Sequence, residues 1–279
     1  MKIFAFLIFI FISKSFIVAT NYYVAVSYGD DTNNGLSIST PFKTIGKAAS
    51  IMSSGDICYI RQGRYHETIS IDNLDGTSSN PVIFTNYNNE RVVIDGTIPI
   101  TSTWTQIGST NLWRTKLSQD IWQLFINWEE QVMARWPNAK FNDGTIWDND
   151  NYWAKGTIDD DENAYSNGTI IDDPYTNSVG SLISLSTKGF DLDESNKEAI
   201  AILNLGSFRT WSRIVTSHSG NTFNYSTVPN WKTKHHYYFL EGRKEFLDQE
   251  GEWWYDTYNN RDSLYYFAGA GTDPNKLDF

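Results

Sequence analysis

Cysteine is almost absent from this chain of 279 residues. Cys58 is its single cysteine, so no disulfide bond can form within the chain. It lies in the apolar run Ile57–Ile60, where we interpret it as a small buried core residue; a reactive free thiol is the alternative. The fold therefore has to be stabilised by a continuous apolar core, for which the chain is long enough.

Basic residues are also in deficit. The chain has 22 lysine and arginine residues against 33 aspartate and glutamate residues, which gives a formal net charge of −11. This charge disfavours nucleic acids and anionic membranes as partners, because both are negatively charged. It also argues against a strongly anionic glycan, unless the fold builds a local basic cleft.

A long apolar run occurs only at the start of the chain. Lys2 precedes an unbroken apolar stretch over residues 3–12, and Ala19 offers a small residue for cleavage. This layout predicts a secretory signal peptide over residues 1–19. A membrane anchor is the alternative, but Lys14 interrupts the run below the roughly 20 apolar residues that span a bilayer. We therefore expect a secreted, extracellular protein, free of the membrane after cleavage, with a net charge of −13.

Short strands dominate the region after the signal peptide. One helix is expected near Ile45, Ala48 and Met52, because these residues share one helical face. Brief apolar segments with turn residues between them then follow at 57–60, 68–71, 82–85 and 92–95. The first and third are about 25 residues apart, and so are the second and fourth, a period typical of one β-solenoid coil. An antiparallel sandwich with short hairpins is the competing interpretation.

An ordered series of short motifs accompanies this spacing. They are Gly29-Asp30-Asp31, Asn34-Gly35, Pro41-Phe42-Lys43-Thr44-Ile45, Gly55-Asp56, Tyr59-Ile60, Gly76-Thr77, Asn80-Pro81-Val82 and Val93-Ile94-Asp95-Gly96. The series resembles the opening coils of pectate-lyase-like right-handed parallel β-helix proteins. The resemblance implies an all-β fold with N-terminal parallel β-helix coils, a short capping helix and a β-rich insertion. It does not specify a reaction, because lyases, hydrolases and esterases share this start.

Two later sequence blocks narrow the resemblance to one branch of these β-helix proteins. Leu124-Phe125-Ile126-Asn127, followed by Ala134-Arg135-Trp136-Pro137-Asn138, and the stretch 238–265 are similar to blocks of large carbohydrate-active β-helix proteins, some grouped with glycoside hydrolases. In those proteins the β-helix continues beyond this point, so the resemblance covers only the front of the family's domain. It implies that the catalytic coils lie outside this chain.

The same comparison suggests a division of the chain into four segments. They are the signal peptide at 1–19, N-terminal β-helix coils at 20–137, a β-rich insertion at 138–235 and an apparently truncated return to the β-helix at 236–279.

Carboxylates cluster near residue 250. Asp248, Glu252 and Asp256 are the candidate catalytic residues, because a glycosidase needs two carboxyl groups flanking the scissile bond. On one strand Glu252 and Asp256 would share a face but lie about 13 Å apart, too far to act as a pair without a third carboxylate. The alternative is a tight turn centred on Gly251, in which these acids accept hydrogen bonds from backbone amides.

Two neighbouring residues are candidates for substrate binding. Arg135 could hold a sugar carboxylate or a pair of hydroxyl groups, with Trp136 beside it. The alternative is an arginine buried under tryptophans that bonds main-chain carbonyls.

Oxygen-rich side chains suggest a metal site and glycosylation sites. Asp30, Asp31 and Asn33 are calcium candidates, although turn formation by the same side chains is the alternative. We expect no other cofactor. Asn167 and Asn224 stand in sequons for N-glycosylation.

The leading interpretation is a secreted glycoside hydrolase or an incomplete front portion of one, acting on a polysaccharide or glycan. A non-catalytic extracellular glycan-binding or adhesion protein is the first alternative, and a polysaccharide lyase is the second. The acidic composition disfavours the lyase, because elimination of uronates usually relies on lysine or arginine.

Overall fold

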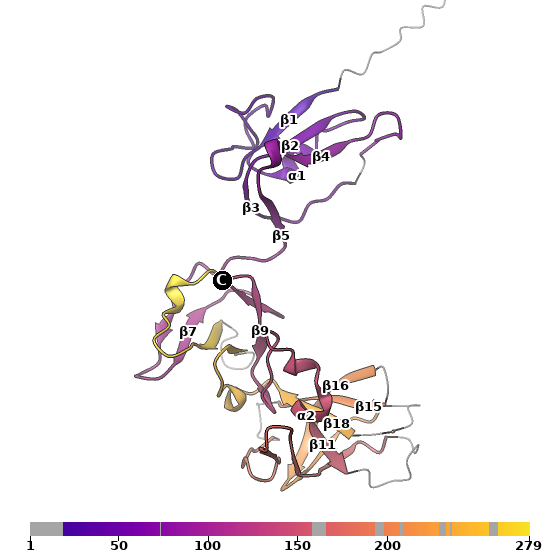
Figure 1. The fold of residues 1–279 in the computed structure, drawn as a ribbon, viewed down its shortest axis with the longest axis vertical. Helices are drawn as coiled ribbons and strands as arrows, with labels where there is room; N and C mark the ends of the chain where they lie inside the picture. Colours follow the sequence, from indigo (N-terminus) through magenta and orange to yellow (C-terminus); the bar gives the residue numbers. More distant parts are fainter. Residues whose placement is uncertain are drawn as a thin grey trace, which may run out of the picture. The chain divides into compact units, whose positions relative to one another are not determined.

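The computed structural model describes residues 19–72, 74–157, 166–192, 198–206, 209–228, 233–234, 236–256 and 262–279. The chain forms two compact units, residues 1–99 and 100–279 (Figure 1). Nearly all of the expected signal peptide lies outside the described residues. None of the helices in the described ranges is long and apolar enough to cross a membrane.

The first unit is built from short parallel strands. Strands β1 (Asn21–Val24), β2 (Ile57–Ile60) and β4 (Ile83–Asn86) form a three-stranded parallel sheet. Strand β3 (Gly63–His66) pairs in parallel with β5 (Val92–Asp95). The prediction of a strand at 68–71 is therefore wrong. The strand lies earlier, at Gly63–His66, where the Tyr65 side chain is buried in the core.

The expected helix is present as α1 (Ile45–Ala49). Its amino end is capped twice, because Thr44 accepts a hydrogen bond from the Lys47 amide and Glu67 accepts two, from Ile45 and Gly46. Its buried face packs into a core that contains Cys58. Cys58 is fully buried, and burial raises the pKa of its thiol to about 12. The interpretation of Cys58 as a core residue is confirmed.

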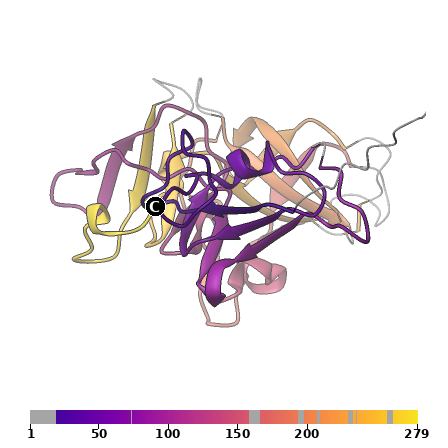
Figure 2. The ribbon, with the colours of Figure 1, turned by 90° about the horizontal axis from the view of Figure 1, so that it is seen from above.

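Six antiparallel strands close into a barrel in the second unit. In spatial order they are β18 (His236–Glu241), β11 (Ala154–Thr157), β12 (Thr169–Asp172), β17 (Thr222–Tyr225), β16 (Arg209–Ser219) and β15 (Ile200–Gly206). Pairing of β15 with β18 closes the ring, and both strands are labelled in Figure 1. Figure 2 shows the same ribbon from above.

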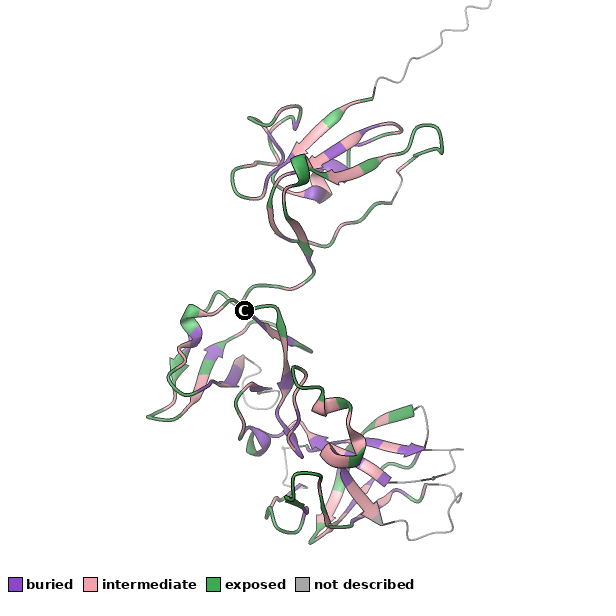
Figure 3. Cartoon of the chain, in the orientation of Figure 1, coloured by how far each residue is buried: buried purple, intermediate pink, exposed green. Residues whose placement is uncertain are grey.

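Side-chain alternation explains the closure. Buried and partly buried residues alternate along β15 and β18 (Figure 3), so that each strand sends every second side chain inward. Ile170, Leu203, Phe223 and Tyr238 are fully buried members of this core.

A second sheet of this unit carries the candidate site. Its spatial order is β6 (Thr105–Gln106), β7 (Leu112–Lys116), β20 (Ser263–Phe267), β19 (Glu252–Tyr255), β9 (Glu129–Met133) and β8 (Leu124–Ile126). Neighbours are antiparallel except β19 and β9.

The other described elements are short. They are β10 (Arg135–Trp136), β13 (Tyr175–Thr176), β14 (Leu182–Ile183), α2 (Asn149–Tyr152) and the 3₁₀ turns η1 (Tyr87–Asn89), η2 (Thr145–Trp147), η3 (Lys244–Phe246) and η4 (Pro274–Lys276).

The predicted right-handed parallel β-helix is wrong, although the chain is all-β with few helices. The closed antiparallel barrel overturns it, and parallel pairs among the described strands are confined to β1–β2–β4, β3–β5 and β9–β19. Tight turns are the physical reason: β16 and β17 join through Gly220, at φ 63°, which reverses the chain and makes the strands antiparallel.

The same pairings overturn the β-helix coils expected after residue 236, whereas the expected insertion stays a prediction. Strands β11 and β15, which lie within 138–235, both pair directly with β18. After residue 236, strands β18 and β20 make antiparallel pairs instead of stacked coils. The segment boundaries at 137 and 235 stay predictions.

Candidate functional site

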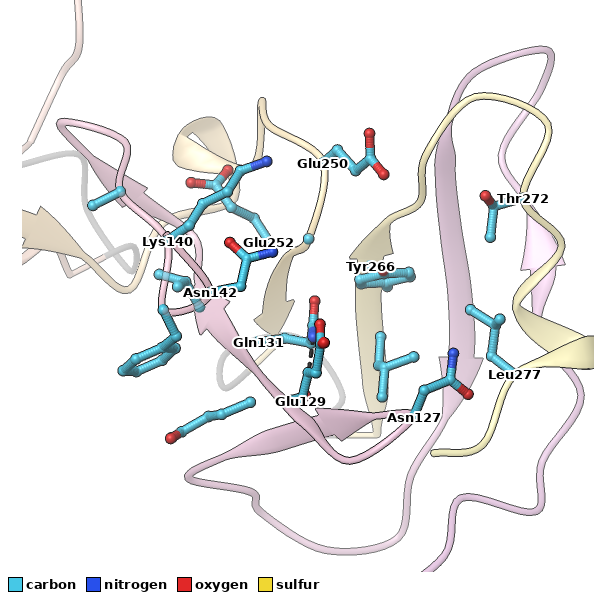
Figure 4. Close-up of a pocket in the computed structure, with 16 residues that line it drawn as sticks. Asn127, Glu129, Gln131, Lys140, Asn142, Glu250, Glu252, Tyr266, Thr272 and Leu277 are labelled. Atoms are coloured by element: carbon cyan, nitrogen blue, oxygen red, sulfur yellow. Dashed lines mark hydrogen bonds between the residues drawn. The ribbon is translucent and has the colours of Figure 1, made fainter. Parts of the chain in front are cut away.

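A polar pocket of about 390 Å³ lies in the second unit. It is bordered by the β8–β9 hairpin, the segment 139–142, the turn before β19, Tyr266 on β20 and the segment before the chain's last residues (Figure 4). The parallel pairing of β9 with β19 sets Val132 beside Glu252, which brings these distant parts of the sequence together.

Glu252 is the most unusual side chain of the pocket. It is 1% exposed, and its Oε2 accepts hydrogen bonds from the backbone amides of Asp248 (3.1 Å) and Gln249 (3.0 Å). Its Oε1 is buried and has no hydrogen-bond partner among the described residues. Burial raises the pKa of Glu252 to about 8, so this carboxyl group is largely protonated at neutral pH.

Three further glutamates line the same pocket. Glu129 and Glu130 begin β9, and Glu250 precedes Glu252 in the turn at Gly251. Glu250 lies near Tyr266: burial and the Glu250 charge together raise the pKa of that phenol to about 12. The pocket thus combines one buried protonated carboxyl group with carboxylates at its surface.

Neutral and basic groups complete the lining. The Gln131 side-chain amide donates a hydrogen bond to the Glu129 main-chain carbonyl. The Gln131 main-chain carbonyl accepts one from the Trp253 indole (3.0 Å). Lys140 and Asn142 extend from the neighbouring loop (Figure 4). Carboxyl, amide and ammonium groups of this kind can bind the hydroxyl groups of a small polar ligand.

Of the three predicted catalytic residues, the structure places only Glu252 in this pocket. Asp248 is exposed, where it accepts a hydrogen bond from Asn138 (2.8 Å) and lies 3.8 Å from the Lys188 ammonium group. Asp256 is buried just beyond β19 and does not line the pocket. The catalytic assignments stay predictions.

Arg135 and Trp136 lie in the interior and not at this pocket. Arg135 is 1% exposed, donates hydrogen bonds to the carbonyls of Pro137 and Tyr152, and stacks 3.6 Å from the ring centroid of Phe239. Burial lowers the pKa of its guanidinium group to about 10. Trp136 belongs to the barrel core. Their substrate-binding role stays a prediction that this geometry does not support.

The calcium candidates are bonded to their own loop. Asp30 accepts hydrogen bonds from Thr32, Asp31 accepts them from the amides of Lys43 and Thr44, and the Asn33 side chain donates to a carbonyl. No group of three or more acidic, histidine or cysteine side chains suited to a metal occurs within the described ranges. Calcium binding stays a prediction.

The two sequon asparagines lie close together on neighbouring segments of the barrel. Asn167 is exposed, and its side chain accepts a hydrogen bond from the Thr169 amide. Asn224 is partly buried and pairs with Thr169 across β12 and β17, with its side-chain amide donating to Ser217. Glycosylation at both stays a prediction.

Sequence reasoning missed most of the lining residues. Glu129, Gln131, Lys140 and Asn142 were not candidates, because nothing local in the sequence reports that β9 pairs with β19. The sequence contained one signal of the site. Glu129 and Glu130 are adjacent acids directly after a hairpin turn, at the start of the amphipathic strand β9.

Comparison with known proteins shows a shared fold with a longer protein. No protein-family model matches this chain. A solved structure described as a glycoside hydrolase has a TM-score of 0.64 at 18% identity, over 93% of this chain and 45% of that one. At this identity the likeness shows the fold alone.

Two other matches are more limited. The complex of XylC with xylose has a TM-score of 0.36 at 15% identity, over 80% of this chain and 32% of that one, and carries no argument. The uncharacterised protein YwoF of Bacillus subtilis strain 168 is 41% identical over 68 residues, 24% of this chain and 14% of that protein. This chain therefore spans less than half the length of each of these proteins.

Proposed function

We propose that this chain is part of a carbohydrate-active protein of the glycoside hydrolase kind, and that its pocket binds a sugar residue beside Glu252. The observation that carries the proposal is the buried carboxyl group of Glu252 at a polar pocket of about 390 Å³, where burial raises its pKa. The fold shared with a glycoside hydrolase supports the substrate class.

The chemistry of glycoside cleavage suits this arrangement. A carboxyl group that keeps its proton at neutral pH can donate it to the leaving oxygen of a glycosidic bond. The reaction also needs a second carboxyl group as nucleophile or base. Glu129 and Glu250, which line the same pocket, are the candidates for this role. Glu252 is accordingly the general acid in this proposal.

A non-catalytic glycan-binding protein is the second candidate. Exposed tryptophan side chains favour it, because aromatic faces stack on sugar rings. Among the described residues Trp122, Trp128 and Trp147 are each at least half exposed.

Hydrolysis and binding assays on the full chain distinguish these candidates. We expect binding to neutral glycans on an array, and release of reducing ends that Glu252→Gln lowers about 10²- to 10⁴-fold. Asp120→Asn is the matched control, because this carboxylate is exposed and does not line the pocket. Binding without hydrolysis identifies the second candidate, and absence of any glycan binding contradicts both.

Secretion is a further part of the proposal. Its support is the apolar stretch at residues 3–12 with Ala19 behind it. Mass spectrometry of the protein from culture medium should find Thr20 as the first residue. An intact Met1 in the cell pellet contradicts this.

A further inference from the structure

A second pocket, also of about 390 Å³, lies in the second unit. It is lined by residues of the segment 100–104, which precedes β6, and of the segment 274–279, which contains η4. All of these lining residues belong to the second unit, and none of them has a charged side chain. The second pocket therefore differs from the glutamate-rich pocket at Glu252.

Hydrogen bonds of the fold hold the walls of the second pocket in place. The Asn275 side chain accepts a hydrogen bond from the Trp104 amide (2.8 Å) and donates one to the Trp104 carbonyl (3.1 Å). The buried Thr115 hydroxyl donates a bond shared between the main-chain carbonyls of Ser102 (3.2 Å) and Thr103 (3.1 Å). The pocket is thus pre-formed, as is usual for the sites of small polar ligands.

The fold leaves several hydrogen-bonding groups of this pocket unused. Thr101, Ser102 and Thr103 are exposed, and their hydroxyl groups make no hydrogen bond within the described part of the chain. The indole N–H of Trp104 is buried and has no hydrogen-bond partner among the described residues. Polar groups of this kind normally bond to a ligand or to an ordered water.

The two pockets of the second unit share a wall. Leu277 lines both of them, and Tyr266 lines the Glu252 pocket beside it (Figure 4). The Tyr266 ring centroid lies 6.1 Å from that of Trp104 and 5.8 Å from that of Phe279, and both of these residues line the second pocket. A ligand that fills the Glu252 pocket and continues past Leu277 therefore enters the second pocket.

We propose that the second pocket is a sugar subsite, and that one neutral oligosaccharide occupies both pockets, with one residue beside Glu252 and another beside Trp104. The inference rests on the proposed function. The hydroxyl groups of residues 101–103 bond those of the sugar, while the rings of Trp104 and Phe279 offer apolar surface to its C–H groups. The sugar is neutral, because a charged group in this uncharged pocket would lose water without gaining a counter-ion.

Calorimetric titration of the full chain with cello-, xylo- and manno-oligosaccharides, from monomer to hexamer, tests the proposal. Wild type should bind the hexamer of at least one series about tenfold more tightly than its monomer, because only the longer ligand reaches the second pocket. An oligogalacturonide hexamer, which is anionic, should bind about tenfold more weakly than this neutral hexamer.

The double variant Ser102→Leu, Thr103→Leu removes two hydroxyl groups and narrows the second pocket. It should weaken hexamer binding about tenfold and leave monomer binding unchanged, because the monomer binds beside Glu252. Ser118→Leu, Gln119→Leu is the matched control, because both residues are exposed and line neither pocket. The control should leave the binding of both ligands unchanged.

The indole N–H of Trp104 reports on the second pocket without any substitution. In ¹⁵N-labelled wild type its assigned NMR resonance should shift when the hexamer is added and stay in place when the monomer is added. A role of Trp104 in the fold alone predicts no shift with either ligand. This measurement decides the question if the double variant does not fold.

The outcomes separate this inference from the proposed function. Hexamer binding that survives Ser102→Leu, Thr103→Leu in a folded protein, or a Trp104 resonance that the hexamer leaves in place, overturns the second subsite alone. Asn142→Leu, which narrows the Glu252 pocket, should in that case still weaken the binding of monomer and hexamer alike. Wild type that binds no member of any series overturns the proposed function together with the second subsite.

Discussion

The two units of this chain treat their buried carboxylates in opposite ways. In the first, Asp95 is 9% exposed, forms an ion pair with Arg64 and accepts a hydrogen bond from the Thr97 amide (2.8 Å). Burial raises its pKa, but the bonds from Thr97 and Arg64 outweigh burial and lower that pKa to about 2. In the second unit burial dominates at Glu252 and raises the pKa to about 8.

The difference between the two pKa values indicates the role of each carboxylate. A paired carboxylate favours the charged form and stabilises the fold at neutral pH. A buried carboxylate with one unpartnered oxygen costs stability there, since the folded state holds a proton that the unfolded chain releases. Asp95 therefore serves the fold of the first unit, whereas Glu252 is best explained by the site.

The largest expected effects test whether the two units unfold independently. Phe42 and Phe223 are both almost fully buried, one in each unit. Replacement of either by alanine should cost about 3–5 kcal/mol through lost burial and a residual cavity. Differential scanning calorimetry should then show that Phe42→Ala lowers only one transition and Phe223→Ala only the other. A single transition that both variants lower would contradict independence.

The stability of the second unit should decrease as pH rises, because Glu252 loses its proton. Its pKa is raised from 4.5 to about 8 by burial, so stability falls as pH rises between these values, by up to about 1.4 kcal/mol per unit. Glu252→Gln removes the titrating group, and should therefore match wild type near pH 5 and exceed its Tm at pH 8. Thermal unfolding from pH 5 to 8 measures this.

Glu250→Gln is the control for this experiment, because Glu250 is exposed in the same pocket. Its curve should run parallel to that of wild type. If the Glu252→Gln curve also runs parallel to wild type, Glu252 is charged in the folded protein and cannot act as the general acid.

Local features of the fold could be predicted from the sequence. The helix at Ile45–Ala49 and the strand Ile57–Ile60 lie within the expected segments, because apolar periodicity reports local structure. The barrel could not be predicted in this way. Its closure depends on β15 pairing with β18, and β16 has an exposed, polar face that hides its strand pattern.

For the candidate site, too, the sequence indicated local features but not the long-range strand pairing. Glu252 belonged to a visible cluster of acids, but the same cluster included Asp248 and Asp256, which the fold directs elsewhere. What distinguishes Glu252 is burial at the start of a strand whose neighbour is β9, and this pairing joins segments far apart in the sequence. Parallel pairing of β1, β2 and β4 likewise resembled a solenoid locally, while the rest of the chain reversed direction at tight turns.

The smallest expected effect is at Asp95, with the opposite sign to Glu252. Its pKa is lowered from 3.8 to about 2, so its stabilisation is present above about pH 4 and is lost as pH falls through about 2. Asp95→Asn should therefore destabilise the first unit by about 2 kcal/mol at pH 6, the scale of a lost charge-assisted hydrogen bond. The difference from wild type should shrink towards pH 2.

Labelling of Cys58 can report this effect without interference from the second unit. The thiol is buried in the first unit and its pKa is about 12, so it should react only when that unit opens. At pH 6 Asp95→Asn should accelerate labelling about 30-fold, which corresponds to about 2 kcal/mol, whereas Phe223→Ala should leave the rate unchanged. Equal acceleration by both variants would show that the units open together, and the contrast between their carboxylates would then describe one cooperative fold.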